Sequence, residues 1–531
     1  MAGYLEPGIY VNYDSSGRGS IGNTPYLIPV IMGSGPKFLK TTISVVRGSG
    51  TSDKLDYVVK GTDDFSVLRI GKNSVSKDYY SPTSIKEILD YKNIESLDPS
   101  NELGLKKPAE DYNLTVDTDG KILINWVATI SEDQIIVDPT YSTETAGQYE
   151  SETIYVRRNR KPAEGSTYYV ELIYPVNSNN TPNQYKPQLI NLLEDVNSYY
   201  GGVTMYTDHT GSTKTINKLG LGLYLAKQNG AGLVYGLQVP YDSSSKSSPD
   251  QFDYAESLSI LQGVESAYRI VPMDLDNNIT NSLINHVNQM SSPEEKAERR
   301  LFAGYQDNNT ISNFADLQKN VGEFAKSISN ERVGIVSTYD VTIVLPDGTI
   351  ISPPEGGSAP YLCAALAGAE SALPLHQSLT RSTITGFDKL QDRVPMLRSQ
   401  KNMLAAYGVI LLEQPGGTGS AITVRHGLTT NMDTIQTREN SITTIKDYTG
   451  KLLRSALDKY VGKESITFES LVRMRATIDS VLDSLVESKI IVSGEVESLQ
   501  QSESTPDSVI LNVKILPPYP CNYINITVYT S

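Results

Sequence analysis

Cysteine, tryptophan and histidine are scarce in this chain of 531 residues. It contains two cysteines, Cys363 and Cys521, one tryptophan, Trp126, and four histidines. Two cysteines are too few for a disulfide framework or a thiolate zinc site, so we expect assembly in a reducing cytoplasm. The histidines lie far apart and form no His-x-x-x-His pair, so the sequence predicts no metal site. We interpret the single tryptophan as part of a strand core.

Long apolar runs and an export signal are also missing. The longest apolar runs, near Tyr26–Met32 and Ala405–Leu412, are far shorter than the roughly 20 residues that a membrane-spanning helix requires. Near the start of the chain, Glu6, Pro7 and Gly8 stand where a signal peptide needs apolar residues. We therefore expect no membrane insertion and no secretion by that route.

Positive charge is in deficit. Lys and Arg total 46 against 61 Asp and Glu, which gives a formal net charge of −15. Such a chain repels a phosphate backbone, so we expect no direct binding of nucleic acid. With 39% hydrophobic and 20% charged residues, the composition is that of a soluble globular protein, and its length suggests three or four domains.

Motifs for common enzyme chemistry are absent or out of context. Residues 17–22 match a dinucleotide-binding spacing but lead into a strand interrupted by proline, so we interpret them as a flexible linker. No Gly-Lys-Ser/Thr phosphate loop and no Gly-x-Ser-x-Gly elbow occur. Asp274, Asp276 and Asn278 have the spacing of calcium ligands, but Ile279 stands where such a loop needs glycine. The sequence therefore predicts no enzyme and no cofactor.

The two ends of the chain read as strand-forming arms joined by breakers. Alternation of apolar and polar residues, with the period of a strand, marks both arms. The small residues after the first arm and the prolines within the second predict hinges. The arm residues are Ile9, Tyr10, Val11 and Tyr13 at one end and Val509, Leu511, Val513, Ile524, Ile526 and Val528 at the other. The hinge residues are Gly17, Gly19, Gly22, Pro517 and Pro518.

The middle of the chain changes character twice. Residues 46–186 are rich in strand-forming runs, with an Asp-Gly turn between Tyr112–Val116 and Ile122–Val127, and predict an inserted β-rich domain. From residue 187 helices and short apolar strands alternate, as in Leu219–Gln228 followed by Gly232–Val239. This succession is typical of a largely parallel sheet flanked by helices. Two amphipathic helices with apolar faces follow near residues 452–460 and 471–485.

The predicted fold class is therefore a multidomain α+β protein with an α/β domain, a β-rich insertion and extended terminal arms. We place its parts at residues 1–22 (arm and linker), 23–45 (first core strand region), 46–186 (inserted β-rich domain), 187–375 (α/β domain), 376–505 (C-terminal core with two helices) and 506–531 (C-terminal strand arm).

Several segments resemble the contractile tail sheath family of bacteriophages and related injection systems. Tyr4–Val11, Tyr-Leu-Glu-Pro-Gly-Ile-Tyr-Val, resembles the Pro-Gly-Val-Tyr-Val start of that family. Leu221–Val239 resembles the helix and strand of its α/β domain, Ser352–Gly368 its Pro-Pro stretch with a small-residue helix, and Leu404–Val409 its Leu-Asn-x-x-Gly-Val segment. Ile422–Thr429 departs from the family's Trp-Gly-Ala-Arg-Thr type of segment. The resemblance says little about residues 46–186, where sheaths carry a variable insertion.

The resemblance implies a structural subunit that polymerises helically around a tail tube, as stacked hexameric rings, and contracts to drive the tube through a bacterial envelope during genome delivery. It implies a location in the virion tail after assembly in the host cytoplasm, with the tube, baseplate and tail terminator proteins as partners and no cofactor. An arm strand added to the sheet of a neighbour would satisfy its unpaired backbone groups. The expected tube-facing residues are Lys451, Arg454, Lys459, Arg473 and Arg475, unless these cations form a solvated helix face.

Two alternatives remain open from the sequence. A non-contractile surface-lattice subunit or adhesin would share the size, the acidity and the β-rich insertion, but it would need an export signal. A cytoplasmic α/β enzyme or ligand-binding protein would have its site at the carboxyl ends of the parallel strands. The second alternative does not account for two strand-forming arms.

Overall fold

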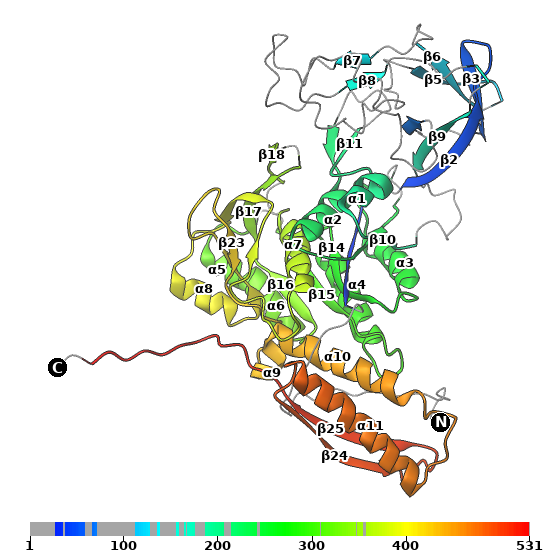
Figure 1. Ribbon diagram of the computed structural model, residues 1–531. Coiled ribbons are helices and arrows are strands. Elements are labelled where there is room, and N and C mark those ends of the chain that lie inside the picture. Colours follow the sequence, from blue (N-terminus) through cyan, green and yellow to red (C-terminus); the bar gives the residue numbers. More distant parts are fainter. Residues whose placement is uncertain are drawn as a thin grey trace. The chain divides into compact units, whose positions relative to one another are not determined.

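The structure is a computed structural model in which two compact units are distinguished. Unit 1 comprises residues 1–35, 182–204 and 216–531, and unit 2 comprises residues 36–181 and 205–215. The residues that the structure describes are 27–35, 38–58, 66–71, 112–119, 121–127, 135–137, 156–158, 164–165, 167–175, 186–206, 214–241, 245–307, 310–346, 348–353 and 357–529. Figure 1 labels most of the elements. The domain boundaries given above stay a prediction.

A seven-stranded sheet forms the centre of unit 1 (Figure 1). Its order is β10 (Gln188–Ile190), β13 (Val234–Gln238), β1 (Ile28–Gly33), β14 (Ala267–Pro272), β15 (Arg300–Gly304), β16 (Val333–Val336) and β21 (Val409–Ile410). Every pairing is parallel except that of β10 with β13. All residues of β1, β14, β15 and β16 are buried, as expected for parallel strands covered on both faces. The predicted largely parallel sheet is confirmed.

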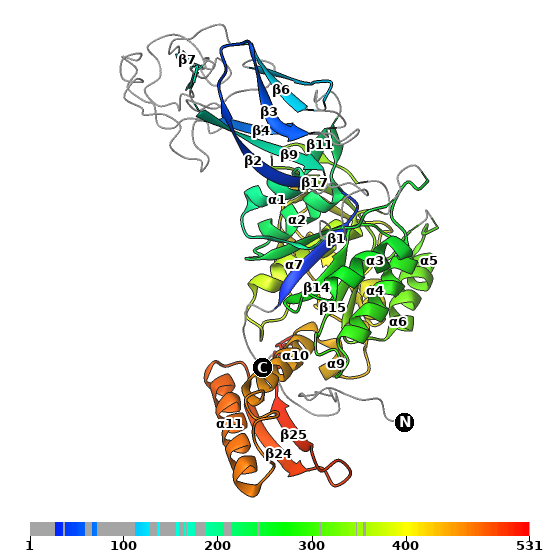
Figure 2. The same cartoon turned by 90° about the vertical axis from the view of Figure 1, so that its right-hand side faces the viewer.

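Helices cover both faces of this sheet (Figure 2). Successive residues of a strand point to opposite faces, so Ile31 of β1 packs in one core while Val30 and Met32 pack in the other. One face carries α1 (Leu193–Tyr200), α2 (Lys218–Gln228) and α7 (Ala359–Ala372). The other face carries α3 (Gln251–Leu261), α4 (Asn277–Met290), α5 (Phe314–Leu317), a π-helical turn (Gln318–Gly322) and α6 (Glu323–Ile328).

Small sheets and short helices complete this part of unit 1. One three-stranded sheet has the order β18 (Ile350–Ile351), β17 (Tyr339–Val344), β20 (Phe387–Asp392), and another β19 (Thr383–Ile384), β23 (Ile422–Val424), β22 (Leu412–Glu413). The remaining elements of this part are α8 (Arg398–Ala405) and α9 (Ile435–Arg438). The pair β11 (Thr204–Tyr206) and β12 (Lys214–Ile216) belongs mostly to unit 2, which includes residues 205–215.

The C-terminal part of unit 1 has a core of its own. It contains α10 (Asn440–Leu457), α11 (Phe468–Glu487), β24 (Ser493–Gln501) and β25 (Val509–Leu516). Leu453 and Leu457 of α10 and Ile478 and Leu482 of α11 are buried in one cluster with Val496 of β24. The two predicted apolar helix faces are thus confirmed as core faces. Within the described residues no helix is long and apolar enough to cross a bilayer.

Unit 2 is built from antiparallel strands. Its sheets have the orders β2 (Phe38–Val46), β9 (Thr167–Pro175), β4 (Ser66–Gly71); β3 (Ser52–Val58), β6 (Lys121–Trp126), β5 (Tyr112–Val116); and β7 (Ile135–Val137), β8 (Val156–Arg158). Trp126 lies in its core, where the indole Nε1 donates to Asp53 at 2.8 Å and Arg47 pairs with the same carboxylate at 2.9 Å. The predicted hairpin around Asp119 and the core position of the tryptophan are confirmed.

Candidate assembly surface

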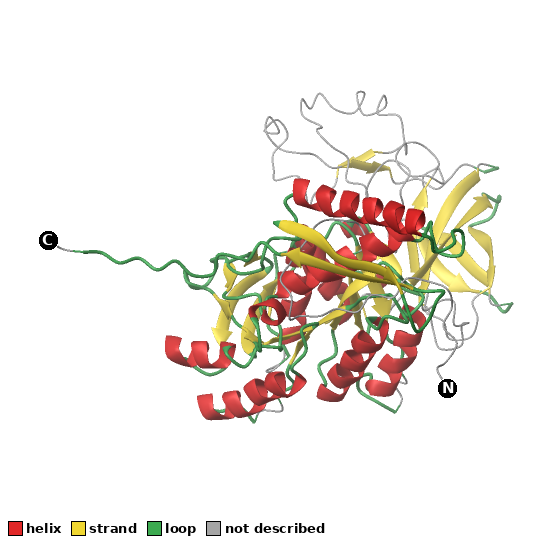
Figure 3. Ribbon diagram, turned by 90° about the horizontal axis from the view of Figure 1, so that it is seen from below, coloured by secondary structure: helices red, strands yellow, loops and turns green. Residues whose placement is uncertain are grey.

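The hairpin of β24 and β25 offers two open strand edges. The strands pair antiparallel from Ser493 opposite Leu516 to Gln501 opposite Val509, with one irregularity between Val496 and Ser498. Within the described residues neither outer edge of this two-stranded sheet pairs with another strand. Such edges present free N–H and C=O groups that a further strand can satisfy. Figure 3 shows the hairpin lying alongside the long helix α11.

The two faces of the hairpin differ. Leu511 and Val513 pack toward the core that α11 provides. On the other face Lys514 lies 3.3 Å from the carboxylates of both Glu495 and Glu497, and all three side chains are at least half exposed. The hairpin is therefore anchored on one face and accessible on the other face and at both edges.

Three of the predicted arm residues belong to this hairpin. Val509, Leu511 and Val513 lie in β25, which pairs with β24 of the same chain along its whole length. One edge of this strand is paired within its own chain, whereas the prediction placed residues 506–531 together in an arm that pairs with another copy. The pattern of alternation is the same whether a strand pairs within a chain or between chains, so the sequence did not distinguish the two cases.

The segment after β25 is extended and exposed. Ile524, Ile526 and Val528, the other predicted arm residues, are 78%, 81% and 81% exposed. Figures 1 and 3 show this segment leaving the rest of unit 1 without forming a helix or strand. Apolar side chains that alternate along an extended backbone have the pattern of a strand that lacks a partner.

The predicted residues at the other end cannot be placed. Ile9, Tyr10, Val11, Tyr13, Gly17, Gly19 and Gly22 lie outside the described residues. The first described residue, Leu27, directly precedes β1 in the central sheet.

The candidate tube-facing cations fall into two groups. Lys451 and Arg454 lie 3.8 Å and 2.6 Å from the buried carboxylate of Glu298, and their side chains are only 15% and 12% exposed. Burial lowers the pKa of Lys451, although the negative charge of Glu298 partly offsets this effect. These two cations therefore pair with a buried acid of unit 1 and are little exposed. The prediction overlooked this because a helical cation looks the same in sequence whether it faces water or a buried acid.

The other three candidates are accessible. Lys459 is exposed at the end of α10, and the side chains of Arg473 and Arg475 on α11 are 55% and 54% exposed. The same helix exposes two apolar side chains, Phe468 at 78% and Val472 at 51%. Both arginines have acidic neighbours, since Arg473 lies 2.5 Å from Glu464 and Arg475 lies 3.8 Å from Asp479. The accessible surface of α11 thus combines charges of both signs with apolar groups, a combination suited to a protein partner.

Polar contacts within the chain occupy the place at the carboxyl ends of the parallel strands where α/β proteins usually bind ligands. The strand order reverses at β1, which lies between β13 and β14. Directly after β14, the buried carboxylate of Asp274 accepts hydrogen bonds from the Ser34 backbone N–H at 2.7 Å and its hydroxyl at 2.6 Å. Tyr254 donates to it at 3.2 Å and Lys218 lies at 3.1 Å. The Asp274 carboxylate therefore binds the polar groups of this crevice that a ligand would otherwise contact.

The calcium-like spacing of Asp274, Asp276 and Asn278 has a structural explanation. Asp276 precedes α4, and its Oδ1 accepts from the backbone N–H groups of Asn278 at 2.6 Å and Ile279 at 3.3 Å. This is the hydrogen bonding of a helix N-cap. Among the residues that the structure describes, no three acidic, histidine or cysteine side chains are grouped so that they could hold a metal ion.

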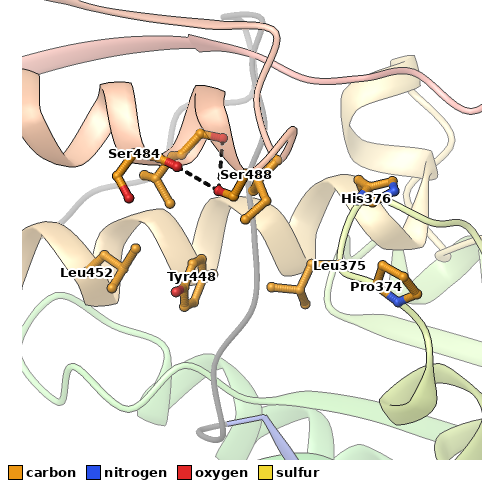
Figure 4. A pocket seen from close by; sticks show the side chains of 9 residues that line it. Pro374, Leu375, His376, Tyr448, Leu452, Ser484 and Ser488 are labelled. Atoms are coloured by element: carbon orange, nitrogen blue, oxygen red, sulfur yellow. Dashed lines mark hydrogen bonds between the residues drawn. The ribbon is translucent and has the colours of Figure 1, made fainter.

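A pocket of about 360 Å³ lies where α10 and α11 meet the segment Pro374–His376 (Figure 4). Tyr448 and Leu452 of α10 and Leu485 of α11 give it apolar walls. The Ser488 hydroxyl in its wall donates to the Ser484 carbonyl at 2.7 Å, so it serves the helix end. His376 also lines the pocket, and among the described residues no hydrogen bond joins it to Ser484 or Ser488.

No family model matches the chain. A tail sheath protein of Mycobacterium phage Bxz1 is 25% identical over 340 residues, which is 62% of this chain and 54% of that protein. The chain thus spans about half the length of the curated relative that it matches.

Sheath structures are among the solved structures that are similar to this chain. The contracted helical sheath of the anti-feeding prophage has a TM-score of 0.49 at 14% identity and covers 66% of this chain and 90% of its own. A sheath tail protein of Desulfitobacterium hafniense has a TM-score of 0.35 at 13% identity, with 47% and 54% covered. A sheath tail protein of Listeria innocua has a TM-score of 0.38 at 10% identity, with 92% and 87% covered.

Proposed function

We propose, from the relationship of this chain to the contractile tail sheath family, that it is a structural sheath subunit which polymerises helically around a tail tube and contracts to drive the tube through a bacterial envelope. The similarity to a phage tail sheath protein over 340 residues carries this proposal. The open-edged hairpin and the exposed apolar tail support it, because an extended apolar segment can pair with an open sheet edge.

In this proposal subunits are joined by shared sheets. Ile524, Ile526 and Val528 would add a strand to an open edge of β24 or β25 in another copy, and the arm around Ile9–Tyr13 would do the same from the other end. Each such strand satisfies edge N–H and C=O groups and buries apolar side chains. The burial stabilises the contact by about 25 cal/mol for each Å² of apolar surface removed from water. A head-to-tail contact of this kind that does not close on itself generates a helix.

The finer assignments are proposals as well. We infer that Lys459, Arg473 and Arg475 are the remaining candidates for contact with the tube, with Phe468 and Val472 beside them. Stacked hexameric rings, contacts with baseplate and terminator proteins, assembly in the host cytoplasm and the absence of catalysis follow from the proposed role. Contraction would release a kinetically trapped array whose subunit contacts are weaker than those of the contracted state.

Electron microscopy of the purified chain at rising concentration tests the proposal. We expect helical polymers from the full chain and folded monomers after removal of residues 523–531. The same result is expected after removal of residues 1–13. Persistent monomers of the full chain at high concentration would contradict the sheath role. Flat sheets instead of tubes would favour a surface-lattice subunit, and undiminished polymers from both truncated chains would contradict the arm contacts.

A further inference from the structure

The first residues after β25 are held to the body of unit 1. Pro517 is buried, and the Tyr519 hydroxyl accepts a hydrogen bond from the Gln436 side chain at 2.9 Å. The Asn522 side-chain amide donates to Glu439 Oε1 at 2.9 Å, and its backbone N–H donates to the Pro520 carbonyl at 2.9 Å. Residues 517–522, called the arm root here, therefore follow a defined path.

Glu439 gives the arm root its strongest anchor. Its carboxylate is fully buried, and His426 Nε2 lies 2.9 Å and Arg438 Nε 3.5 Å from the same oxygen that Asn522 contacts. The second carboxylate oxygen, Oε2, is buried without a hydrogen-bond partner among the described residues. A buried carboxylate that is short of donors loses heavily when one more is removed. This deficit favours the docked position of Asn522.

The anchor belongs to a rigid part of the fold. Glu439 directly precedes α10, and the next side chain, Asn440, is buried and accepts from Arg269 at 3.1 Å as well as from Arg300. Arg269 lies on β14 and Arg300 on β15, so both belong to the central strands of the seven-stranded sheet. Arg269 is in turn paired with Glu370 of α7 at 2.5 Å. The arm root is thus tied, through two adjacent residues, to the centre of unit 1.

Beyond Asn522 the contacts stop. Tyr523 is 72% exposed and Tyr529 is 89% exposed. Among the described residues, no hydrogen bond or ion pair holds residues 523–529. The change from a held to a free chain therefore falls between Asn522 and Tyr523, five residues after the start of the proline-containing run that the sequence suggested as the hinge.

We propose that residues 517–522 form a fixed root which aims the C-terminal arm, that Asn522 is its positioning residue through Glu439, and that the arm pivots at Tyr523. This inference rests on the proposed function for its purpose. A segment whose exit point and direction are set in advance loses less conformational freedom when it docks on another copy. The root would therefore favour polymerisation without touching the neighbouring subunit.

Spin labelling tests the root on the unpolymerised chain. Cys521 is exposed whereas Cys363 is fully buried, so a nitroxide reagent attaches at Cys521 in the natural sequence. A second chain carries the label at Thr527→Cys in a Cys521→Ser background. We expect the label at residue 521 to rotate severalfold more slowly than the label at residue 527. Equal mobility at the two positions would overturn the fixed root.

Substitutions test the role of Asn522. Asn522→Ala is expected to raise the mobility of the label at Cys521 toward that at residue 527, while Asn525→Ala, the same change at an exposed residue of the free segment, leaves it unaltered. Asn522→Ala should also raise the critical concentration for polymerisation severalfold, with the melting temperature of the monomer retained. An unchanged label mobility in Asn522→Ala would overturn the anchor, and an unchanged critical concentration would overturn its part in assembly.

The two proposals can fail separately. If the wild-type chain forms no polymers, the proposed sheath function fails, and the label mobility still decides whether the root is fixed. If polymers form and the root is mobile, the sheath function stands and the fixed root is rejected.

Discussion

Arg332 Nη1 lies 2.7 Å from Asp447 Oδ2, and both side chains are buried. The pair joins the residue before β16 to the middle of α10, and the Tyr268 hydroxyl donates to the same carboxylate oxygen at 2.8 Å. Burial raises the pKa of Asp447, but the Arg332 guanidinium outweighs this and leaves the pKa below its ordinary value. The pair is therefore charged, and it ties the C-terminal part of unit 1 to the central sheet.

Removal of one partner of this pair should be costly. Arg332→Met leaves the Asp447 carboxylate buried without its countercharge, and such losses typically cost about 3–5 kcal/mol. Urea unfolding followed by circular dichroism measures the free energy of unfolding. The control is Lys514→Met, which removes an exposed pair with Glu495 and should change that energy by about 1 kcal/mol or less. Equal losses in the two variants would contradict the importance of the buried pair.

His286 should make the stability depend on pH. Burial and the adjacent Arg299 guanidinium lower its pKa to about 3, and the two side chains are 2.8 Å apart. Between pH 6.5, the ordinary pKa of histidine, and about 3, the unfolded chain binds a proton at this residue that the folded chain excludes. Stability therefore falls as the pH drops through this window, by about 1.4 kcal/mol for each pH unit from this group alone.

The variant His286→Gln isolates this contribution. Its free energy of unfolding should decline less steeply than that of the wild type between pH 6 and pH 4.5, since glutamine does not titrate. Acidic groups titrate in both chains, so the difference between the two curves is the relevant quantity. Parallel curves would contradict a buried, neutral His286.

Gly368 in α7 should not tolerate a larger side chain. A Cβ at this position would collide with the backbone of Ala226 in α2, whereas a Cβ on Gly232 would meet nothing within 4 Å. We expect Gly368→Ala to lower the free energy of unfolding by about 1–3 kcal/mol, because two packed helices must separate. Gly232→Ala should leave this free energy nearly unchanged. Thermal unfolding of both variants measures the difference. Similar melting temperatures for both variants would contradict the close approach of α2 and α7.

A charge in the free segment should act on assembly alone. Ile526 and Thr527 are neighbours and both exposed, but only Ile526 belongs to the apolar alternation. Ile526→Lys should raise the critical concentration for polymerisation severalfold, while Thr527→Lys should raise it less. Both monomers should keep their free energy of unfolding within about 0.5 kcal/mol, as expected for exposed positions. Sedimentation of polymers measures the first quantity, and the reverse ranking would argue against the expected strand face.

Local patterns predicted much of the fold. The alternation of Leu219–Gln228 with Gly232–Val239 corresponds to α2 and β13, and the apolar face of Ile478 and Leu482 packs as expected. The pairing of β25 with β24 could not be predicted, because the sequence of β24, Ser-Gly-Glu-Val-Glu-Ser-Leu-Gln-Gln, carries only a weak apolar alternation. A strand that is polar on both faces specifies its pairing only weakly.

Buried charge was the other feature that sequence patterns did not reveal. Arg269, Arg299 and Arg300 are almost fully buried, although arginine is rarely buried without partners. The partners of Arg269 are Glu370 and Asn440, which lie far along the chain, so no local motif joins them. The same distance in sequence hid the contact of Asn522 with Glu439, and with it the difference between the arm root and the free segment.

The position of β1 has a consequence for synthesis on the ribosome. This strand ends at Gly33, yet it lies in the sheet between β13, which begins at Val234, and β14, which begins at Ala267. The wholly apolar segment of β1 therefore stays without its partner strands while the sequence of unit 2 is translated. Long-range pairing of this kind slows folding and exposes the nascent chain to aggregation. Chaperones that bind extended apolar segments should accordingly raise the yield of native subunits.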